Sequence, residues 1–513
     1  MQLQHLKSGT DVRGTALNPE NPAQIDLTDE VIARIVGGFV RFLAAKTKKP
    51  QSELKISVGH DSRLSADRIQ AAVLRELTAN GICALDCALC STPAMFMTTQ
   101  TENCDGAVQI TASHHPWDRN GLKFFTRRGG LSGGELQAIL ADAENTAPKS
   151  TADTKISAVS LDYLSIYCEQ LKTMIRDGVK DANNFEKPLT GLKIVVDAGN
   201  GVGGFYAEKV LAPLGADTAG SRYLDPDGRF PNHVPNPENA AAMESAREAT
   251  LESGADLGVI FDTDVDRGGA VTADGEELNR NRLVAVAAAI ALEENAGASV
   301  VTDSVTSAGL TKFINNTLGG KHIRFKRGYK NVIDEAARRC ADGENAPLAI
   351  ETSGHAAFRE NYFLDDGAYL VTRIIIKLCL LKRAGGGLGD LIADLEEPAE
   401  EKEVRLGITA PDFKAYGEEM IARVESQAAV CADVKIADDS REGTKIIFQS
   451  PDTDGFFIFR LSVHDPIIPI NFESAVSGGN RKMAKTLLGW LSDADGLNLL
   501  PLQQFSEDFE KSY

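Results

Sequence analysis

Three segments of the chain repeat one pattern, and this repetition limits the possible fold more than any other feature. Each segment has a short β-branched strand, a turn with Asp or Gly, and the start of a helical pattern. The segments are LKISVGHDSRLSA from Leu54, LKIVVDAGNGVGG from Leu192 and ASVVTDSVTSAG from Ala298. Helical patterns alternate with apolar strands around all three, which is typical of βαβ units in parallel or mixed sheets. We therefore expect three similar α/β domains with mixed sheets.

The C-terminal part of the chain follows a different pattern. GTKIIFQS, GFFIFRLSV and IIPINFES read as consecutive strands joined by turns, and the helical pattern RKMAKTLLGWL follows them. This order predicts a fourth domain of the α+β type. Polar or charged segments at 145–155 and 396–404 are plausible linkers. The predicted domains are residues 1–150, 156–277, 278–396 and 403–513.

Composition and charge exclude several classes of partner. The chain has 513 residues, a formal net charge of −19 and 43% hydrophobic residues. This charge argues against nucleic acid or an anionic membrane as the main partner. The N-terminal segment has no apolar signal core, and the longest apolar runs are about half of a membrane span. We expect a cytoplasmic protein that is a monomer or a homodimer. Because the net charge is negative, an anionic substrate would need local positive charge, and KHIRFKRGYK from Lys321 is one basic segment that could supply it.

Cysteine spacing raises the question of a zinc site. Cys83, Cys87 and Cys90 lie in GICALDCALCSTPA, an alternating apolar stretch without a fourth soft ligand nearby. Buried reduced thiols fit this stretch better than zinc does. Reduced thiols also agree with a reducing cytoplasm.

ADLGVIFDTDVDRGG, residues 255–269, is a hydrophobic strand that runs into three aspartates. Asp262, Asp264 and Asp266 alternate, so their side chains project to the same side of an extended segment. An EF-hand is excluded because Arg267 and Ala273 occupy the positions of its required Gly and Glu. Three carboxylates with open positions suit Mg²⁺ joined by a phosphate oxygen, whereas the alternative is a solvated acidic turn.

DAGNGVGG, residues 197–204, contains G-x-G-x-x-G after a strand, and Asp225 follows at roughly the spacing of a dinucleotide site. The next segment, DPDGRFPNHVPNPE, is a turn-rich loop and not a further βαβ unit. We therefore interpret the glycines as close strand–helix packing, not as a nicotinamide site.

Two further loops contain groups that can perform chemistry. ITASHHPWDRNGLKFF places Ser113 beside two histidines. Three interpretations are open: Ser113 is a nucleophile with a histidine base, it is part of a metal site, or it belongs only to a capped turn. In IETSGHAAF, Glu351, Ser353 and His355 alternate and can share one face. A glutamate can accept hydrogen bonds from sugar hydroxyls, and a histidine can bind phosphate or transfer a proton. A turn with a satisfied histidine is the alternative.

These motifs, in this order, resemble those of the α-D-phosphohexomutases, the phosphoglucomutase/phosphomannomutase family. GTDVRG resembles the family's GTDGIRG, TASHHP its phosphoserine loop TASHNP, and DTDVDR its metal loop DGDGDR. ETSGHAAF with DDGAY resembles the sugar loop GE-x-SGH, and RLSVHDP the phosphate loop RPSGTEP. PDGRFPNHVPNPE matches the family closely. The resemblance covers nearly the whole chain, and the loops that depart from the family pattern resemble a divergent, phosphoglucosamine-mutase-like branch.

The resemblance implies four domains around a central cleft and a phosphoserine mechanism. Ser113 would donate a phosphoryl group to a hexose monophosphate, and the resulting hexose 1,6-bisphosphate would return its other phosphate to Ser113. Ser113, Asp262, Asp264 and Asp266 would hold Mg²⁺. The hexose 1,6-bisphosphate would also act as activator or phosphoryl donor. No G-x-S-x-G elbow supports a hydrolase with a histidine base.

The resemblance also assigns roles to other residues. Lys123, Arg13 and His355 would assist proton and charge movement beside Ser113. Glu351 and Ser353 would hold sugar hydroxyls. The expected contacts to substrate and phosphate come from Arg267, Lys330, Arg460, Ser462 and His464.

Several positions depart from the family pattern. His115 stands where Asn is usual, and Tyr329 where a phosphate-contacting His is common. In the phosphate loop, Val463 and His464 replace Gly-Thr, Asp465 replaces Glu, and Pro469 replaces a later Arg. These changes leave two alternatives open besides a mutase: a synthase that releases hexose 1,6-bisphosphate, and an inactive sugar-phosphate sensor. The hexose itself, glucose, mannose or glucosamine, is also open.

Overall fold

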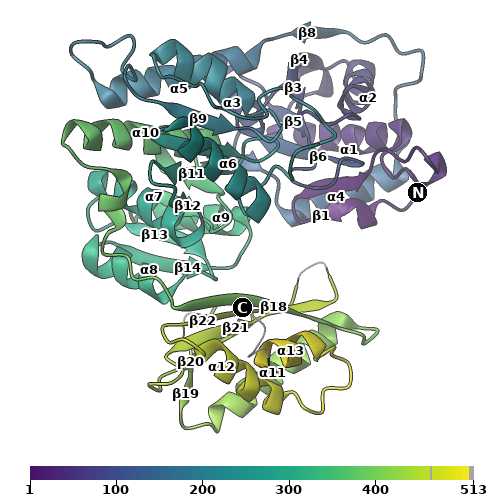
Figure 1. Ribbon diagram of the computed structural model, residues 1–513. Helices are drawn as coiled ribbons and strands as arrows, with labels where there is room; N and C mark the ends of the chain where they lie inside the picture. Colours follow the sequence, from purple (N-terminus) through teal and green to yellow (C-terminus); the bar gives the residue numbers. More distant parts are fainter. Residues whose placement is uncertain (439, 463–464, 508–513) are drawn as a thin grey trace. The chain divides into compact units, whose positions relative to one another are not determined.

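The computed structural model describes residues 1–438, 440–462 and 465–507 (Figure 1). The chain forms two compact units. The first unit contains residues 1–291 and 353–392, and the second contains residues 292–352 and 393–513. Within the described residues, no helix is both long enough and apolar enough to cross a membrane.

The first unit begins with a mixed sheet in the order β1-β2-β6-β5-β3-β4-β8, with β7 paired to β6. β5, β3, β4 and β8 are parallel neighbours, whereas β6 runs antiparallel to both β5 and β2. Helix α1 packs against α2 and α4 over a fully apolar core that includes Phe39 and Phe124. The elements are β1 (Lys7–Ser8), β2 (Asp11–Thr15), α1 (Asp29–Thr47), β3 (Lys55–His60), α2 (Ala66–Ala79), β4 (Cys83–Leu89), α3 (Thr92–Thr101), β5 (Gly106–Ile110), β6 (Arg119–Thr126), β7 (Gly129–Gly130), α4 (Gly133–Asn145) and β8 (Ala158–Ser160).

A second sheet of the first unit has the order β12-β11-β10-β9. β10 is parallel to β9 and antiparallel to β11, so the turn from β10 to β11 lies at one end of a buried strand pair. All five residues of β10 are buried, as its sequence LGVIF predicts. The elements are α5 (Tyr163–Val179), β9 (Ile194–Asp197), α6 (Ala240–Ser253), β10 (Leu257–Phe261), β11 (Gly268–Thr272), β12 (Glu277–Leu278), α7 (Arg280–Glu294), β16 (Ala356–Phe358), β17 (Leu364–Asp365) and α10 (Gly367–Arg383).

The second unit combines a parallel sheet with an antiparallel one. β14, β13 and β15 are parallel neighbours. The C-terminal sheet is antiparallel in the order β18-β22-β21-β20-β19, and its core includes Phe457, Phe459 and Phe472. The elements are β13 (Ser299–Asp303), α8 (Ala308–Lys312), β14 (Lys321–Phe325), α9 (Tyr329–Ala341), β15 (Leu348–Ile350), β18 (Glu400–Gly407), α11 (Phe413–Ala429), β19 (Val434–Ile436), β20 (Thr444–Phe448), β21 (Gly455–Phe459), β22 (Ile467–Ser474), α12 (Gly479–Trp490) and α13 (Leu500–Glu507).

The predicted fold class is confirmed: three α/β regions with parallel or mixed sheets precede an α+β region whose strands follow one another in the chain. The four exact boundaries stay a prediction. The prediction for the cysteines holds for Cys87 and Cys90, which are free and buried; burial raises the pKa of Cys87 to about 12. It is wrong for Cys83, which is exposed at the first residue of β4 although Leu85 and Cys87, two and four residues later, are buried.

We predict that Gly121→Ala destabilises the first unit. A Cβ at Gly121 would lie 2.1 Å from the Val12 carbonyl oxygen and 2.8 Å from that of Thr111. Both are backbone atoms of neighbouring strands, so relief requires the strands to separate. Overpacking of this kind costs about 1–3 kcal/mol, or roughly 5 °C in the unfolding midpoint. Scanning calorimetry measures the shift.

Gly134→Ala is the matched control, because a Cβ there meets nothing within 4 Å. The packing account is wrong if the two variants unfold at the same temperature.

Candidate active site

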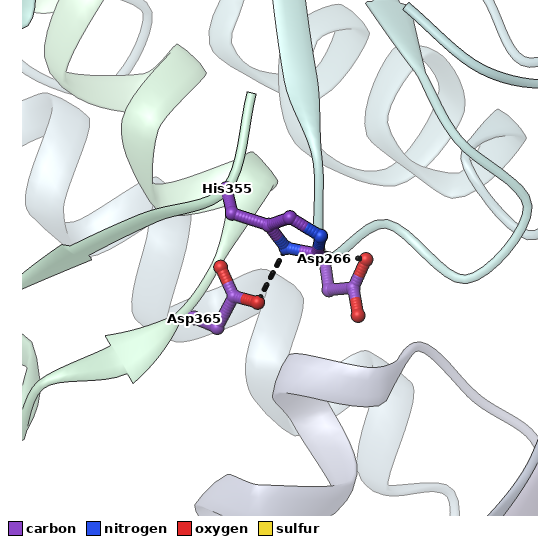
Figure 2. Close-up of side chains that lie close together, drawn as sticks. All are labelled: Asp266, His355 and Asp365. Atoms are coloured by element: carbon purple, nitrogen blue, oxygen red, sulfur yellow. Dashed lines mark hydrogen bonds and ion pairs between the residues drawn. The ribbon is translucent and has the colours of Figure 1, made fainter. Parts of the chain in front are cut away.

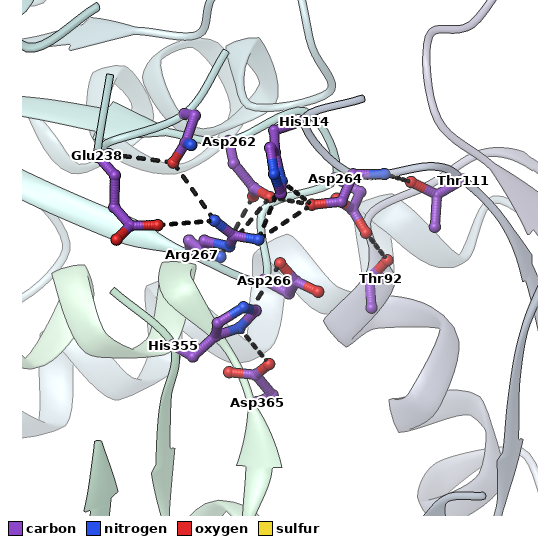
Figure 3. A network of polar contacts seen from close by, with 12 residues as sticks. Thr92, Thr111, His114, Glu238, Asp262, Asp264, Asp266, Arg267, His355 and Asp365 are labelled. Carbon is purple, nitrogen blue, oxygen red and sulfur yellow. Dashed lines mark hydrogen bonds and ion pairs between the residues drawn. The ribbon is translucent and has the colours of Figure 1, made fainter. Parts of the chain in front are cut away.

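Three carboxylates meet at the end of β10. Asp262, Asp264 and Asp266 follow this strand directly, are fully buried, and offer oxygens that lie within 4.8 Å of one another (Figure 3). Val265, between two of them, has a left-handed φ of 68° as the chain reverses into β11. The buried strand therefore delivers all three side chains to one point, as their alternation predicts.

The charges of these carboxylates are only partly compensated. Burial, together with repulsion from the other two aspartates, raises the pKa of Asp262 well above its ordinary value. Burial and the neighbouring Asp266 raise the pKa of Asp264 to about 6. Burial also acts to raise the pKa of Asp266, but the ammonium of Lys123 outweighs it and lowers that pKa. The Oδ1 atoms of Asp264 and Asp266 are buried without a hydrogen-bond partner among the described residues. Unused carboxylate oxygens and mutual repulsion both fit a hard metal cation at this point.

Thr92, at the start of α3, fixes the orientation of Asp264. Its hydroxyl donates to Asp264 Oδ2, and its backbone N–H donates to the Asp264 carbonyl oxygen at 2.9 Å. Helix α3 is thus joined to the aspartate turn at its N-terminus. The sequence analysis missed this residue.

Ser113 lies in the loop between β5 and β6 and reaches the same cluster. Its Oγ donates to Asp262 Oδ2 at 3.1 Å and lies 3.2 Å from Nδ1 of His114. The residue is buried and has a left-handed φ of 49°. Thr111 Oγ1 accepts the Ser113 N–H at 2.9 Å. The capped-turn interpretation therefore describes this loop, whereas a role of Ser113 in a metal site stays a prediction.

Arg63 holds the Ser113 loop in place through the backbone. Its Nη2 donates to the carbonyl oxygens of Ser113 and His115, both at 2.6 Å. Its Nη1 donates to those of Pro116 at 2.6 Å and Arg119 at 2.8 Å. One buried guanidinium thus binds four carbonyl groups of a single loop. The sequence analysis missed Arg63, although it stands at the turn of the first repeated segment.

Two of the predicted basic residues approach the site from β6 and β2. Lys123 Nζ donates to Asp266 Oδ2 at 2.5 Å. Arg13 pairs with Asp11 at 2.8 Å and donates to the Thr111 carbonyl oxygen. Lys123 is therefore in contact with the carboxylates, whereas Arg13 supports the loop that contains Ser113.

Arg267 lies between the aspartates and the histidine loop. Its Nη2 donates to Nδ1 of His114 at 3.0 Å and lies 3.5 Å from Ser113 Oγ, and its Nε is 3.9 Å from Asp262 Oδ2. Burial and the charge of Arg267 lower the pKa of His114 to about 3. His114 is therefore neutral and accepts from Arg267 at Nδ1. That it is no hydrolase base stays a prediction. Glu238 lies 3.5 Å from the other end of this guanidinium.

His355 reaches the cluster from the β16–β17 hairpin (Figure 2). Its Nδ1 donates to Asp365 Oδ2 at 2.6 Å and lies 3.9 Å from Asp266 Oδ1. Burial alone would lower the pKa of His355, but the carboxylates of Asp365 and Asp266 outweigh it and raise that pKa. The sequence analysis used Asp365 only as part of a motif and missed its bond to His355. Ser353, two residues earlier, has a buried hydroxyl without a partner among the described residues.

The other predicted substrate residues belong to the second unit. Glu351 accepts the Gly328 N–H at 2.6 Å, and Lys330 is paired with Asp334 one helical turn away. Arg460 Nη2 is 3.7 Å from Glu403 Oε2. The Ser462 hydroxyl accepts the Asp465 N–H at 3.3 Å. Val463 and His464 lie outside the described residues.

Comparisons with known proteins agree with the fold and the motifs. Models of the phosphoglucomutase/phosphomannomutase α/β/α domains I, II and III match residues 5–149, 166–275 and 279–398. A phosphoglucomutase of Neisseria gonorrhoeae is 30% identical over 449 residues, which are 87% of this chain and 90% of the relative. A phosphomannomutase of Salmonella montevideo is 29% identical over 459 residues, 88% of this chain and 92% of the relative.

A solved structure extends this likeness to nearly the whole chain. A phosphoglucomutase/phosphomannomutase family protein of Burkholderia thailandensis has a TM-score of 0.76 and 25% identity, over 97% of this chain and 100% of that one. The fold and the serine–aspartate site define a phosphohexomutase. The chain belongs to the phosphoglucomutase/phosphomannomutase family, which confirms the resemblance of the motifs.

We predict that Asp264→Asn stabilises the metal-free protein. The raised pKa of Asp264 means that its charged form is disfavoured in the fold, and Asn removes this charge while it keeps an acceptor for Thr92. In chelator at pH 8 the unfolding midpoint should rise by about 3 °C. Adding millimolar Mg²⁺ should raise the midpoint of the natural protein more than that of the variant.

Asp225→Asn, at an exposed position of the same unit, is the control and should change neither midpoint. An unchanged or lower midpoint of Asp264→Asn in chelator would contradict the account of repulsion.

Proposed function

We propose that this phosphohexomutase interconverts hexose 1-phosphates and hexose 6-phosphates by means of a phosphoryl group carried on Ser113. The observation that carries the proposal is the placement of Ser113 Oγ against Asp262, within a buried cluster of three carboxylates, a lysine, an arginine and a histidine. The relatives named phosphoglucomutase and phosphomannomutase support the same reaction. The names of the relatives point to glucose and mannose phosphates as the first substrates to test.

The proposed metal is Mg²⁺, with Asp262, Asp264, Asp266 and a phosphoryl oxygen on Ser113 as ligands. Oxygen ligands alone, together with a phosphate partner, favour Mg²⁺ over softer ions. When bound, the ion would neutralise charge on the moving phosphoryl group. The Oδ1 atoms of Asp264 and Asp266, which accept no hydrogen bond from the described residues, support this assignment.

Lys123, Arg267 and His355 supply the other charges that the transfer needs. In the transfer, the bond between Ser113 Oγ and phosphorus breaks and a bond from a sugar oxygen to phosphorus forms. The sugar hydroxyl loses its proton, and Ser113 Oγ regains one. Asp365 accepts the hydrogen bond from Nδ1 of His355, so Nε2 is the ring nitrogen through which His355 exchanges a proton. Arg267, 3.5 Å from Ser113 Oγ, stabilises negative charge on that oxygen.

Other residues would hold the remainder of the substrate. As the family motifs imply, Glu351 and Ser353 would accept from sugar hydroxyls, and Arg460 and Ser462 would bind the phosphate that does not react. After one transfer the hexose 1,6-bisphosphate turns over and returns its other phosphate to Ser113. Release of the bisphosphate as the main product stays an alternative, because the variant positions Val463 and His464 lie outside the described residues.

We predict that part of the purified protein carries one phosphate and that Ser113→Ala carries none. The variant should also lose at least 99% of activity, because no other hydroxyl is placed against Asp262 among the described residues. Intact-mass measurement detects the phosphate. Phosphorus NMR with glucose, mannose and glucosamine phosphates identifies the substrate and shows whether free bisphosphate accumulates.

Ser157→Ala, at an exposed position, is the matched control and should behave as the natural protein. Retention of more than a few per cent of activity in Ser113→Ala would refute the phosphoserine mechanism.

We also predict that Arg63→Lys lowers kcat at least tenfold with little change in KM. A lysine cannot donate to all four carbonyl groups at once, so the Ser113 loop loses its fixed conformation while the second unit is untouched. Steady-state kinetics measures both constants. Arg128→Lys, an exposed control in the turn between β6 and β7, should leave both unchanged. A normal kcat for Arg63→Lys would show that the loop holds Ser113 without this residue.

A further inference from the structure

One loop of the first unit contacts both of the arginines that lie at Ser113. This segment, DPDGRFPNHVPNPE, covers residues 225–238, and we call it the 225–238 loop. At its C-terminal end, Glu238 Oε2 lies 3.5 Å from Nη1 of Arg267 (Figure 3), and Asn236 Oδ1 lies 3.4 Å from the same nitrogen. The other terminal nitrogen of this guanidinium, Nη2, lies 3.5 Å from Ser113 Oγ. The loop therefore holds Arg267 by the nitrogen that does not face Ser113.

The middle of the loop packs on the turn that contains Arg63. The guanidinium carbon of Arg63 lies 5.2 Å from the ring centroid of Phe230, which is the distance of a cation–π contact. A Cβ at Gly228 would lie 2.5 Å from two backbone atoms of this turn, so the loop and the turn are in direct contact. Arg63 in turn binds the four carbonyl groups of the Ser113 loop. The 225–238 loop thus supports Arg63 and Arg267 together.

His233 joins the second half of this loop to the end of a strand. Its Nε2 lies 2.9 Å from Oδ1 of Asp197, the last residue of β9, and its Nδ1 lies 3.1 Å from the Val234 carbonyl oxygen. Ser245 of α6 donates to the other carboxylate oxygen of Asp197 at 2.6 Å. The side chains of His233 and Asp197 are only 4% and 0% exposed, so water competes little for this pair. One buried contact therefore ties the loop to β9 and α6.

The protonated form of His233 fits both of its acceptors. Only the doubly protonated ring can donate at Nδ1 and at Nε2 at once. Burial acts to lower the pKa of His233, but the Asp197 carboxylate and the Val234 carbonyl outweigh it and raise that pKa. Tyr223 is a further titratable side chain that faces His233, with the two rings edge to face and their centroids 5.4 Å apart. The two hydrogen bonds of the ring therefore depend on its charge, and neutral His233 keeps only one of them.

A second attachment fixes the first half of the loop. Asn200 lies in the glycine-rich segment DAGNGVGG; its side chain donates to the Asp225 carbonyl oxygen at 2.9 Å and accepts from Asn232 at 2.8 Å. Its own carbonyl oxygen accepts the Asp227 N–H at 2.9 Å. Asn200 and Asp197 belong to the same strand–turn segment of the second repeat. The segment with the spacing of a dinucleotide fingerprint therefore serves as the base of the 225–238 loop.

We propose that His233 is a positioning residue of the active site, which fixes the 225–238 loop through its contact with Asp197. The loop in turn holds Arg63 and Arg267 at Ser113. Arg63 sets the conformation of the serine loop, and Arg267 brings positive charge to Ser113 Oγ, so both depend on one attachment. The inference rests on the proposed function in one respect, that Ser113 carries the phosphoryl group.

Two substitutions of His233 test this role in steady-state kinetics. His233→Ala removes both hydrogen bonds of the ring, so kcat should fall at least tenfold while KM changes less than twofold, because the affected arginines act on transfer at Ser113. His233→Gln should stay within about threefold of the natural kcat, because its amide donates to Asp197 from nearly the position of Nε2. His5→Ala removes an exposed histidine 3.9 Å from Asp26 in the same unit and should change neither constant. A kcat of His233→Ala within twofold of the natural value overturns the proposal.

The ratio of kcat between the natural protein and His233→Gln reports the charge of the ring. Below its raised pKa, His233 is protonated and donates to both acceptors, whereas above that pKa it donates to one, as glutamine does. The ratio should therefore fall from about two- to threefold near pH 6 to about one near pH 9. Groups elsewhere in the site titrate in both proteins and cancel in the ratio. A ratio that stays constant over this range overturns the proposal, and it decides alone if His233→Ala does not fold.

A double variant separates action through the loop from a general loss of stability. Glu238→Gln weakens the contact of the loop with Arg267 and should lower kcat about threefold. Because His233→Ala already releases the loop, adding Glu238→Gln to it should lower kcat little further. Losses that multiply in the double variant would contradict a common path through the loop.

Intact-mass measurement of the same proteins separates this inference from the proposed function. Phosphate on Ser113 together with an unchanged kcat in His233→Ala would remove the inference alone. The expected order of kcat values in a protein without phosphate on Ser113 would remove the phosphoserine mechanism and leave His233 as a positioning residue.

Discussion

The crowding of three buried carboxylates at the end of β10 is the constraint on which the active site depends. Asp262, Asp264 and Asp266 cannot all be charged in a dry site unless cations approach them. Lys123 arrives from β6 and His355 from the β16–β17 hairpin, so the compensation joins segments that are far apart in the sequence. The same groups are placed to stabilise the negative charge of a phosphoryl group during its transfer. Folding of the first unit and its chemistry therefore depend on one set of charges.

The Ser113 loop adds a second constraint, which is conformational. A left-handed backbone at a serine costs about 1 kcal/mol or more, and such conformations persist only where the surroundings impose them. Arg63 imposes this one through hydrogen bonds to four carbonyl groups, and Thr111 binds the Ser113 amide. The loop thereby directs Oγ at Asp262 before any substrate is present. Preorganisation of this kind lowers the reorganisation that transfer requires.

The local pattern of the sequence was sufficient for the elements and for groups close together in the chain. The alternating aspartates after LGVIF predict the carboxylate cluster, and the repeated strand–turn–helix segments predict the α/β regions. Residues that act through distant backbone or distant side chains were not visible in this way. Arg63 binds carbonyl groups 50 or more residues away, and Thr92 meets Asp264 across 172 residues. Cys83 shows that alternation does not fix where burial begins along a strand, because it is exposed while Leu85 and Cys87 are buried.

A single-turnover experiment tests the central claim, that phosphate passes between Ser113 and the sugar, most directly. The protein is labelled with radioactive phosphate at Ser113 and mixed with a small amount of glucose 1-phosphate or mannose 1-phosphate in a quench-flow instrument. The account predicts that label leaves the protein at the same rate at which it appears in a hexose bisphosphate, before any labelled hexose 6-phosphate forms. Product that forms while the label stays on the protein, or label that is released as inorganic phosphate, would contradict it.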